Sequence, residues 1–453
     1  MKERLLLTIL LLTSTIFVHG QTTVWEMDTL TCDTTIVRHW EGDKYIIYTN
    51  NSSGQGTVHY HDNASGTTVS ADLPANVFVR DFRIAHDTVF AGGNCANQGF
   101  LACFDINMFV SGLFAPHFLF SPSPYTFFPG ADCGISGNIK IVDVTRIALF
   151  EDGGATRIAY IAENHNYFSS PSVYDSRVGY GDAAFLSGTW DVCTYYYNKD
   201  AWDLFTDICV TRNNIVLTAR SDDYINIRFQ AFKKVRDFAN VPNFPPGYGF
   251  DNHKAIGKVM VTPIKDDIVS IAYHYSESAS GGLAIRTIDF SSVTPSLLCG
   301  LDIPENISTI SQWHMDEMRY SKDNDVLLIL NQIYDPLDGC KPYIFCLTAP
   351  LSPAMPSTLA VEYYPLQKEM QSLDLFDVNR LITSGHGGSS LASVATKPCA
   401  SPAACSISGA TAAHTTSPTI LLWNRHQCTF IPPNSTGYNL DVTYSSNINL
   451  ICN

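Results

Sequence analysis

The chain consists of short apolar stretches separated by polar turns. In Val79–Gly93, the sequence V-R-D-F-R-I-A-H-D-T-V-F-A-G-G places two apolar stretches on either side of a polar turn at His86 and Asp87. Such an arrangement is typical of two β-strands joined by a turn. Helical periodicity is nearly absent, and Gly, Pro and Ser interrupt the chain at short intervals. The pattern therefore predicts an all-β protein.

The same hairpin pattern recurs along the chain in different residues. Six further copies are Ile36–Thr49, Thr145–Asn164, Thr206–Arg220, Gly257–Tyr273, Asp316–Asn331 and Ser372–Gly385. The copies begin about 45 to 70 residues apart, and more strand-like sequence follows them, as at Phe100–Ile106 and Leu283–Phe290. This spacing fits four short strands and their loops, which is the content of one β-propeller blade.

We therefore predict a β-propeller of about seven blades, or of six blades if Ile36–Thr49 is not a true copy. Tandem β-sandwiches are the alternative, because hairpins of unrelated domains also resemble one another. The period and the number of copies favour the propeller. So do the consecutive apolar residues of Ile215–Leu217 and Val326–Leu330, since strands that are buried on both faces lack polar alternation. We expect the closing strand at Thr419–Trp423, after a loop-like insertion near residues 397–418.

Residues 1–20 have the features of a signal peptide. Lys2 and Arg4 precede the apolar run Leu5–Val18, and Gly20 is the small residue before the expected cleavage site. The run is short for a membrane span, and an uncleaved anchor is the alternative. We expect residues 21–453 to form a single propeller domain without membrane insertion. Its expected location is the periplasm, the cell surface or the extracellular space.

The chain is acidic, with a formal net charge of −15 at pH 7. Residues 1–20 carry two positive charges and one negative charge, so that their removal leaves −16. This charge argues against nucleic acid as a partner, because phosphate binding needs an excess of Lys and Arg. It also argues against binding to anionic membrane surfaces. No feature of the sequence predicts a cofactor, and we expect a monomer.

All thirteen cysteines, from Cys32 to Cys452, follow the expected signal peptide. In an oxidising compartment the expected state of cysteine is the disulfide. Three pairs are close in sequence and could form bridges: Cys95 with Cys103, Cys340 with Cys346, and Cys399 with Cys405. The odd number leaves at least one thiol unpaired. No C-x-x-C occurs, and no cysteine has a zinc-ligand spacing with histidine, so no metal site is predicted.

The signal peptide followed directly by Gln21, and the repeated hairpin phrase that ends in small residues, resemble a group of uncharacterised secreted β-propeller-like proteins from gut Bacteroidetes. The resemblance covers most of the chain after the signal peptide. It implies a propeller fold and an exported location. It carries no catalytic motif and implies no activity.

Catalytic motifs of known enzyme classes are absent from the sequence, including H-E-x-x-H, G-x-S-x-G and the P-loop. A site must therefore be sought from the predicted fold. If each copy holds the first two strands of a blade, the segments after the copies emerge together on one rim of the propeller. The ligand-binding candidates in these segments are Asn94, Glu163, His165, Asp222, His274, Tyr275, Glu277, Tyr334, Asp335 and His386.

These side chains supply the amide, carboxylate, imidazole and phenol groups that hydrogen-bond a polar ligand such as a glycan. The leading hypothesis is a non-catalytic binding protein whose partner is a glycan or a protein. The first alternative is a carbohydrate-active hydrolase or lyase, which would need two carboxylates, or a histidine with a carboxylate, in the central funnel. The second alternative is a structural component of a cell-surface assembly.

Overall fold

The computed structural model describes most of the β-structure of the chain. The described residues are 25–31, 34–51, 54–96, 98–120, 139–166, 173–182, 193–196, 204–220, 228–233, 254–277, 280–292, 296–305, 314–322, 326–335, 339–348, 358–365, 369–375, 380–387, 391–398 and 406–408. Within some of these strands the description covers the backbone alone. The expected signal peptide lies outside the described residues.

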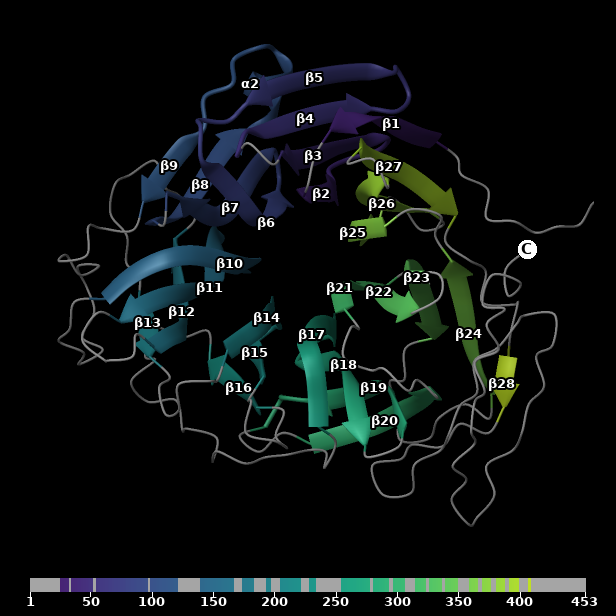
Figure 1. The fold of residues 1–453 in the computed structure, drawn as a ribbon. Helices are drawn as coiled ribbons and strands as arrows, with labels where there is room; N and C mark the ends of the chain where they lie inside the picture. The colour runs from purple at the N-terminus through teal and green to yellow at the C-terminus, as the bar shows by residue number, and fades with distance from the viewer. Residues whose placement is uncertain are drawn as a thin grey trace, which may run out of the picture.

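The strands form seven antiparallel sheets around a central axis (Figure 1). Blade 1 contains β2 (Thr34–His39), β3 (Lys44–Asn50), β4 (Gly56–Asp62) and β5 (Thr67–Asp72). Blade 2 contains β6 (Val77–Ala85), β7 (Thr88–Cys95), β8 (Gln98–Asp105) and β9 (His117–Phe120), with the short helix α2 (Ile106–Val110) after β8. Blade 3 contains β10 (Ile139–Asp152), β11 (Ala155–Asn166), β12 (Val173–Asp182) and β13 (Cys193–Tyr196).

The chain continues around the ring in the same order. Blade 4 has β14 (Leu204–Val210), β15 (Asn214–Arg220) and β16 (Arg228–Lys233) as its described strands. Blade 5 contains β17 (Lys254–Lys265), β18 (Ile268–Glu277), β19 (Ser280–Asp289) and β20 (Ser296–Glu305). Blade 6 contains β21 (His314–Ser321), β22 (Val326–Asp335), β23 (Gly339–Thr348), β24 (Thr358–Pro365) and β28 (Ser406–Ser408). Blade 7 contains β25 (Glu369–Leu375), β26 (Arg380–Gly387), β27 (Leu391–Pro398) and β1 (Trp25–Thr31).

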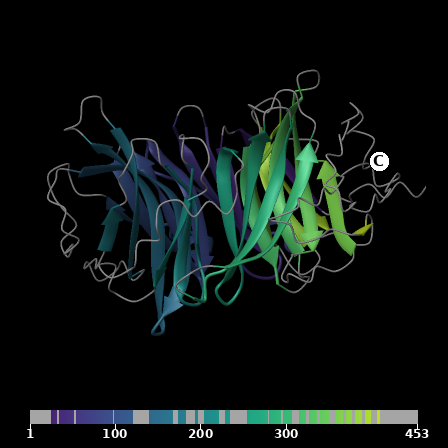
Figure 2. The same ribbon diagram turned by 90° about the horizontal axis from the view of Figure 1, so that it is seen from below.

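This topology is a seven-bladed β-propeller and confirms the predicted fold class. Each of the seven repeated hairpins forms the two innermost strands of one blade. The first strands contact one another in chain order, and β25 returns to β2, so the ring is closed. In Figure 2 the strands run broadly along the axis of the ring. No helix in the described part of the chain is long and apolar enough to cross a membrane.

The ring closes through the beginning of the described chain. β1 pairs antiparallel with β27, with Trp25 opposite Thr396, and so supplies the fourth strand of blade 7 (Figure 1). The expected closing strand Thr419–Trp423 lies outside the described residues. Part of the expected insertion is a strand, because β28 pairs with β24 at the outer edge of blade 6.

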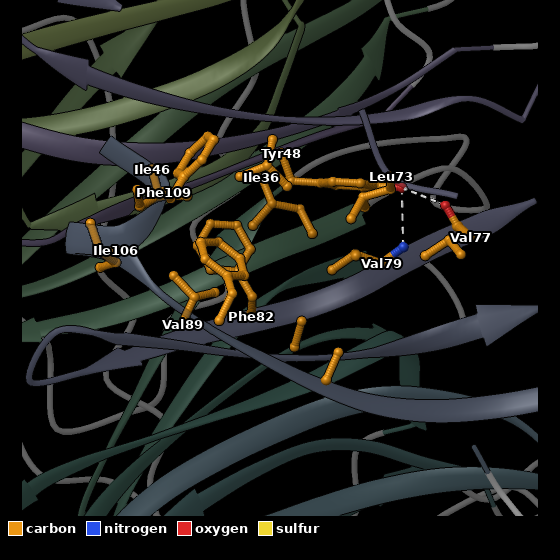
Figure 3. Packing of buried hydrophobic residues seen from close by; sticks show 14 of the residues in the cluster. Ile36, Ile46, Tyr48, Leu73, Val77, Val79, Phe82, Val89, Ile106 and Phe109 are labelled. Carbon is orange, nitrogen blue, oxygen red and sulfur yellow. Dashed lines mark hydrogen bonds between the residues drawn. The ribbon is translucent and has the colours of Figure 1, made fainter. Parts of the chain in front are cut away.

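Apolar side chains fill the space between neighbouring blades. One such cluster joins blades 1 and 2 and includes Tyr48, Val79 and Phe82 (Figure 3). The phenol of Tyr48 donates to the carbonyl of Val77 (3.4 Å) and accepts from the backbone N–H of Val79 (3.1 Å), so one hydroxyl links the two sheets. The residues of β3 from Tyr45 onward are consecutively buried, as expected for a strand covered on both faces.

Close packing explains why the hairpin Val79–Gly93 ends in two glycines. A methyl group on Gly92 would collide with Val144 of the next blade, and one on Gly93 would collide with the carbonyl oxygen of Phe78. Glycine is therefore required at Gly92 because blade 3 approaches blade 2 closely, and at Gly93 because the backbone of β6 approaches that of β7.

The expected disulfide between Cys95 and Cys103 is wrong. Both thiols are free, and Cys209 is free as well. Cys95 lies opposite Gln98 across β7 and β8, so Cys103 is five residues further along its strand. At about 3.3 Å per residue the two cysteines are much too far apart for a bridge. The cysteines of the other two expected bridges lie outside the described side chains.

Candidate functional site

The innermost strands share an irregularity at one level of the channel. Their pairing with the second strands shifts register at least once in the first half of six of the seven inner strands. The residues at these β-bulges include Arg80, Thr145, Thr206, Lys258, Asp316 and Gln371. All six line one cavity of about 510 Å³ in the channel. Because a bulge redirects a side chain, the repeated bulges build the wall of this cavity, which we call the channel-mouth cavity.

The channel-mouth cavity is polar. Apart from Ile36 and Val79, every lining residue is polar or charged. Besides the six residues at the bulges, the polar lining consists of Thr34, Thr35, Arg38, Asp143, Arg146, Glu163, Glu317 and Ser372. The Oγ1 atom of Thr35 is buried and has no hydrogen-bond partner among the described residues.

A buried network of ion pairs lies at Arg38 and Glu317 of the cavity wall. Arg38 Nη2 donates to Asp81 (2.9 Å) and to Glu317 (3.1 Å). Glu317 also pairs with Arg319 at 2.6 Å and with Arg83 at 3.8 Å. Arg38, Asp81 and Glu317 have side chains no more than 5% exposed. The network crosses the ring, since it joins blades 1, 2 and 6.

The network fixes the charge states of its members. Burial alone would raise the pKa of the Glu317 carboxyl, but the guanidinium groups of Arg319 and Arg38 outweigh burial and hold that pKa well below its usual range. Burial alone would lower the pKa of Arg38, and Glu317 and Asp81 instead raise it. Glu317 is therefore an anion and Arg38 a cation throughout the ordinary pH range, and neither is available for proton transfer.

The side chain of the residue after a bulge often accepts a hydrogen bond from the backbone of a neighbouring blade. The backbone N–H of Ile147 donates to Asp81 (3.1 Å), and that of Val261 donates to Asp207 (2.9 Å). The N–H of Val37 likewise donates to Ser372 (3.2 Å), which links blade 7 to blade 1. These bonds satisfy backbone groups that face the channel, where no neighbouring strand can pair with them.

Two carboxyl groups face each other in the wall at blade 3. Asp143 of β10 lies directly opposite Glu163 of β11. Asp143 Oδ2 accepts from Arg80 (2.8 Å) and from the amide of Asn94 (2.9 Å), whereas its Oδ1 is buried without a partner. Burial raises the pKa of the Glu163 carboxyl, and the charge of Asp143 raises it further. The Glu163 carboxyl is therefore easier to protonate than an ordinary glutamate.

The predicted site residues fall into four groups. Glu163 lines the channel-mouth cavity, and Asn94 supports it through Asp143. His274 is buried between blades 5 and 6, where Nε2 is 3.0 Å from Asn331 Oδ1, and it does not line the cavity. His165, Tyr275, Glu277, Tyr334, Asp335 and His386 lie at the ends of second strands, in β11, β18, β22 and β26, but their side chains are outside the described part. Asp222 lies outside the described residues.

The sequence prediction missed the residues at the bulges, although a signal for them is present. The copies share an apolar–polar–polar–apolar motif that breaks strand alternation, as in V-R-D-F from Val79, M-D-E-M from Met315 and M-Q-S-L from Met370. In each motif the first polar residue lines the cavity. In V-R-D-F and M-Q-S-L the second polar residue accepts a hydrogen bond from the backbone of a neighbouring blade. In M-D-E-M the second polar residue belongs to the buried network of ion pairs.

Comparison with known proteins adds no family. No protein-family model matches the chain, and no curated protein matches it in sequence. Solved structures that resemble it include the polysaccharide lyase Uly1, with a TM-score of 0.46, 9% identity and coverage of 81% of this chain and 90% of that chain. An arginine-to-alanine triple mutant of AofleA from Arthrobotrys oligospora gives a TM-score of 0.37 at 12% identity, and the match covers 77% of this chain and 95% of that chain. The Nup133 β-propeller domain of Vanderwaltozyma polyspora gives a TM-score of 0.39 at 10% identity, and the match covers 83% of this chain and 98% of that domain. These similarities are too low to indicate function.

Proposed function

We propose that the protein is an exported, non-catalytic binding protein that takes a polar, hydroxyl-rich ligand such as a glycan in the channel-mouth cavity. The observation that carries this proposal is the ring of β-bulges. Six inner strands depart from regular pairing near one level and direct a side chain into the same cavity. The residue after three of these bulges links neighbouring blades, but the residue at each of the six bulges lines the cavity instead, which linking the blades does not require.

The chemistry of the wall supports a ligand rich in hydroxyl groups. Most charges of the wall are already paired inside the protein, as in Arg80 with Asp143 and Arg38 with Glu317. What remains for a ligand is a set of hydrogen-bonding groups, among them the hydroxyl of Thr145 and the carboxyl of Glu163. Hydroxyl groups both donate and accept, so they match such a mixed surface.

A carbohydrate-active hydrolase or lyase is the second candidate, because Asp143 and Glu163 face each other in the cavity wall. A hydrolase of the common type needs two carboxyl groups that both reach the substrate. Asp143 does not meet this requirement, since Oδ2 is bound by Arg80 and Asn94 and Oδ1 is buried. The arrangement therefore favours binding by Glu163 alone.

A glycan array tests the proposed function. Thr145 lines the cavity, so Thr145→Trp would fill it, whereas Thr156 lies at the opposite end of the same β10–β11 hairpin. We expect the wild type and Thr156→Trp to bind the same glycans, and Thr145→Trp to bind them at least about tenfold more weakly. If Thr145→Trp binds as tightly as the wild type, the binding site is not the channel-mouth cavity. If no glycan on the array binds, the glycan proposal is contradicted. Release of shortened glycans by the wild type would establish the second candidate.

A further inference from the structure

The ionisable groups in and behind the cavity wall are nearly all paired. Six basic residues are each within ion-pair distance of an acid: Arg38, Arg80, Arg83, Arg146, Lys258 and Arg319. Six acidic residues are their partners: Asp81, Asp143, Asp207, Asp316, Glu317 and Asp374. The two sets cancel in charge.

Glu163 is the seventh acid of this group and has no ion pair or hydrogen bond within the described part of the chain. It lines the cavity and lies opposite a second carboxylate, that of Asp143. Arg80 attracts it, but the guanidinium of Arg80 is already bound to Asp143 at 2.8 Å. The wall at blade 3 therefore carries one negative charge more than the paired groups compensate. A desolvated carboxylate in this position gains most from a cation that enters the cavity.

The rest of the wall indicates what kind of cation fits. Thr34 and Thr145 are partly exposed, line the same cavity and each offer a hydroxyl oxygen as an acceptor. The carboxylate of Asp143 lies directly opposite Glu163, although its own oxygens are bound by Arg80 and Asn94 or buried. In the described residues, no group of three or more His, Cys, Asp or Glu side chains is arranged to hold a metal ion. An ammonium group, which needs only acceptors for its three N–H bonds, suits this wall better than a metal.

We propose that the channel-mouth cavity selects a sugar that bears a protonated amine, with the ammonium group bound by Glu163 and the hydroxyl groups bound by the threonine-rich remainder of the wall. This inference rests on the proposed function, because it specifies the ligand class of the same site. Glu163 is then the residue that determines specificity between an amino sugar and its neutral counterparts.

Three β-1,4-linked tetramers, of glucosamine, N-acetylglucosamine and glucose, test the inference by isothermal titration calorimetry at about pH 6, where an amine is charged. They share a linkage and differ at one substituent. We expect the glucosamine tetramer to bind the wild type at least about tenfold more tightly than the other two, as for a charge-assisted hydrogen bond. Glu163→Gln should remove this preference.

Glu41→Gln is the matched control, because it removes the same charge from an exposed position distant in sequence from Glu163. It should keep the preference, which shows that the acidic surface as a whole is not responsible. Glu163→Ala repeats the test if the Gln variant is unstable. Equal affinity of the wild type for the three tetramers, or a preference that survives in Glu163→Gln, would overturn the inference and leave the proposed function intact. If none of the three binds, the inference is overturned, and the array result decides the proposed function separately.

Discussion

Glu317→Gln should destabilise the protein more than almost any other isosteric change. The Glu317 carboxylate pairs with Arg319 at 2.6 Å, Arg38 at 3.1 Å and Arg83 at 3.8 Å, in a position only 5% exposed. The substitution keeps the shape but removes the charge that these buried guanidinium groups share. Asp81 still pairs with Arg38 and Arg83. Breaking a buried pair in this way costs about 3–5 kcal/mol of the free energy of unfolding.

The assay is urea unfolding followed by tryptophan fluorescence, with Glu41→Gln as the control. Glu41 pairs with Lys44 at 2.6 Å, but on the surface, where screening by water makes such pairs weak. We expect a large fall in the urea midpoint for Glu317→Gln and no measurable change for Glu41→Gln. The pKa of Glu317 is lowered in the folded state, so its stabilisation is present above the ordinary glutamate pKa and is lost as the pH falls through the lower folded value. A loss below about 1 kcal/mol at pH 7 would refute the reasoning, because the network would then not depend on this charge.

Three further substitutions test other parts of the structure. Asp267 is buried and accepts from Thr211 (2.6 Å), from Asn213 and from Asn214, and these bonds outweigh burial and lower its pKa. Asp267→Ala should therefore cost about 2–4 kcal/mol in urea unfolding at pH 7, and the difference from wild type should shrink below about pH 4; a difference independent of pH would contradict this. Glu163 has a raised pKa, so ionising it penalises the fold as the pH rises above its ordinary value of 4.5. Thermal unfolding of Glu163→Gln should give equal or greater stability than wild type at pH 7, with the difference vanishing near pH 4, and a less stable variant at pH 7 would be the contrary result. Gly93→Ala forces a methyl group against the carbonyl of Phe78 and should lower stability by about 1–3 kcal/mol, whereas an unchanged melting temperature would show that blade 2 can relax.

The sequence allowed the scaffold to be predicted because the hairpins repeat. Each copy, such as Val79–Gly93, forms the inner strands of one blade, and the glycines that end it are required by close packing. The closure of the ring by β1 was not predictable in this way, since Trp25–Thr31 belongs to no copy and pairs with residues far along the chain. The absence of a bridge between Cys95 and Cys103 follows from a strand register that sequence spacing does not contain.

The ten site residues predicted from the sequence come from the ends of the copies or from the segments after them, whereas most of the channel-mouth cavity comes from their beginnings. Attention to the segments after each copy identified Glu163 and Asn94, both of which contribute to the wall at blade 3. The rest of the cavity comes from the beginning of the copies, where paired polar residues such as Arg80 and Asp81 interrupt the apolar pattern. The paired polar residues at a bulge can be recognised in the sequence. Whether their side chains point into the channel depends on how the seven blades are arranged, which the sequence does not show.

The most direct test of the account is a crystal structure of the protein with its tightest-binding array glycan. We predict electron density for a sugar in the channel-mouth cavity, with one polar group of the sugar within hydrogen-bond distance of Glu163 and others near Thr145 and Thr34. A glycan bound on the outer strands of a blade, with the cavity occupied by water alone, would contradict the central claim that the bulged inner strands form the binding site.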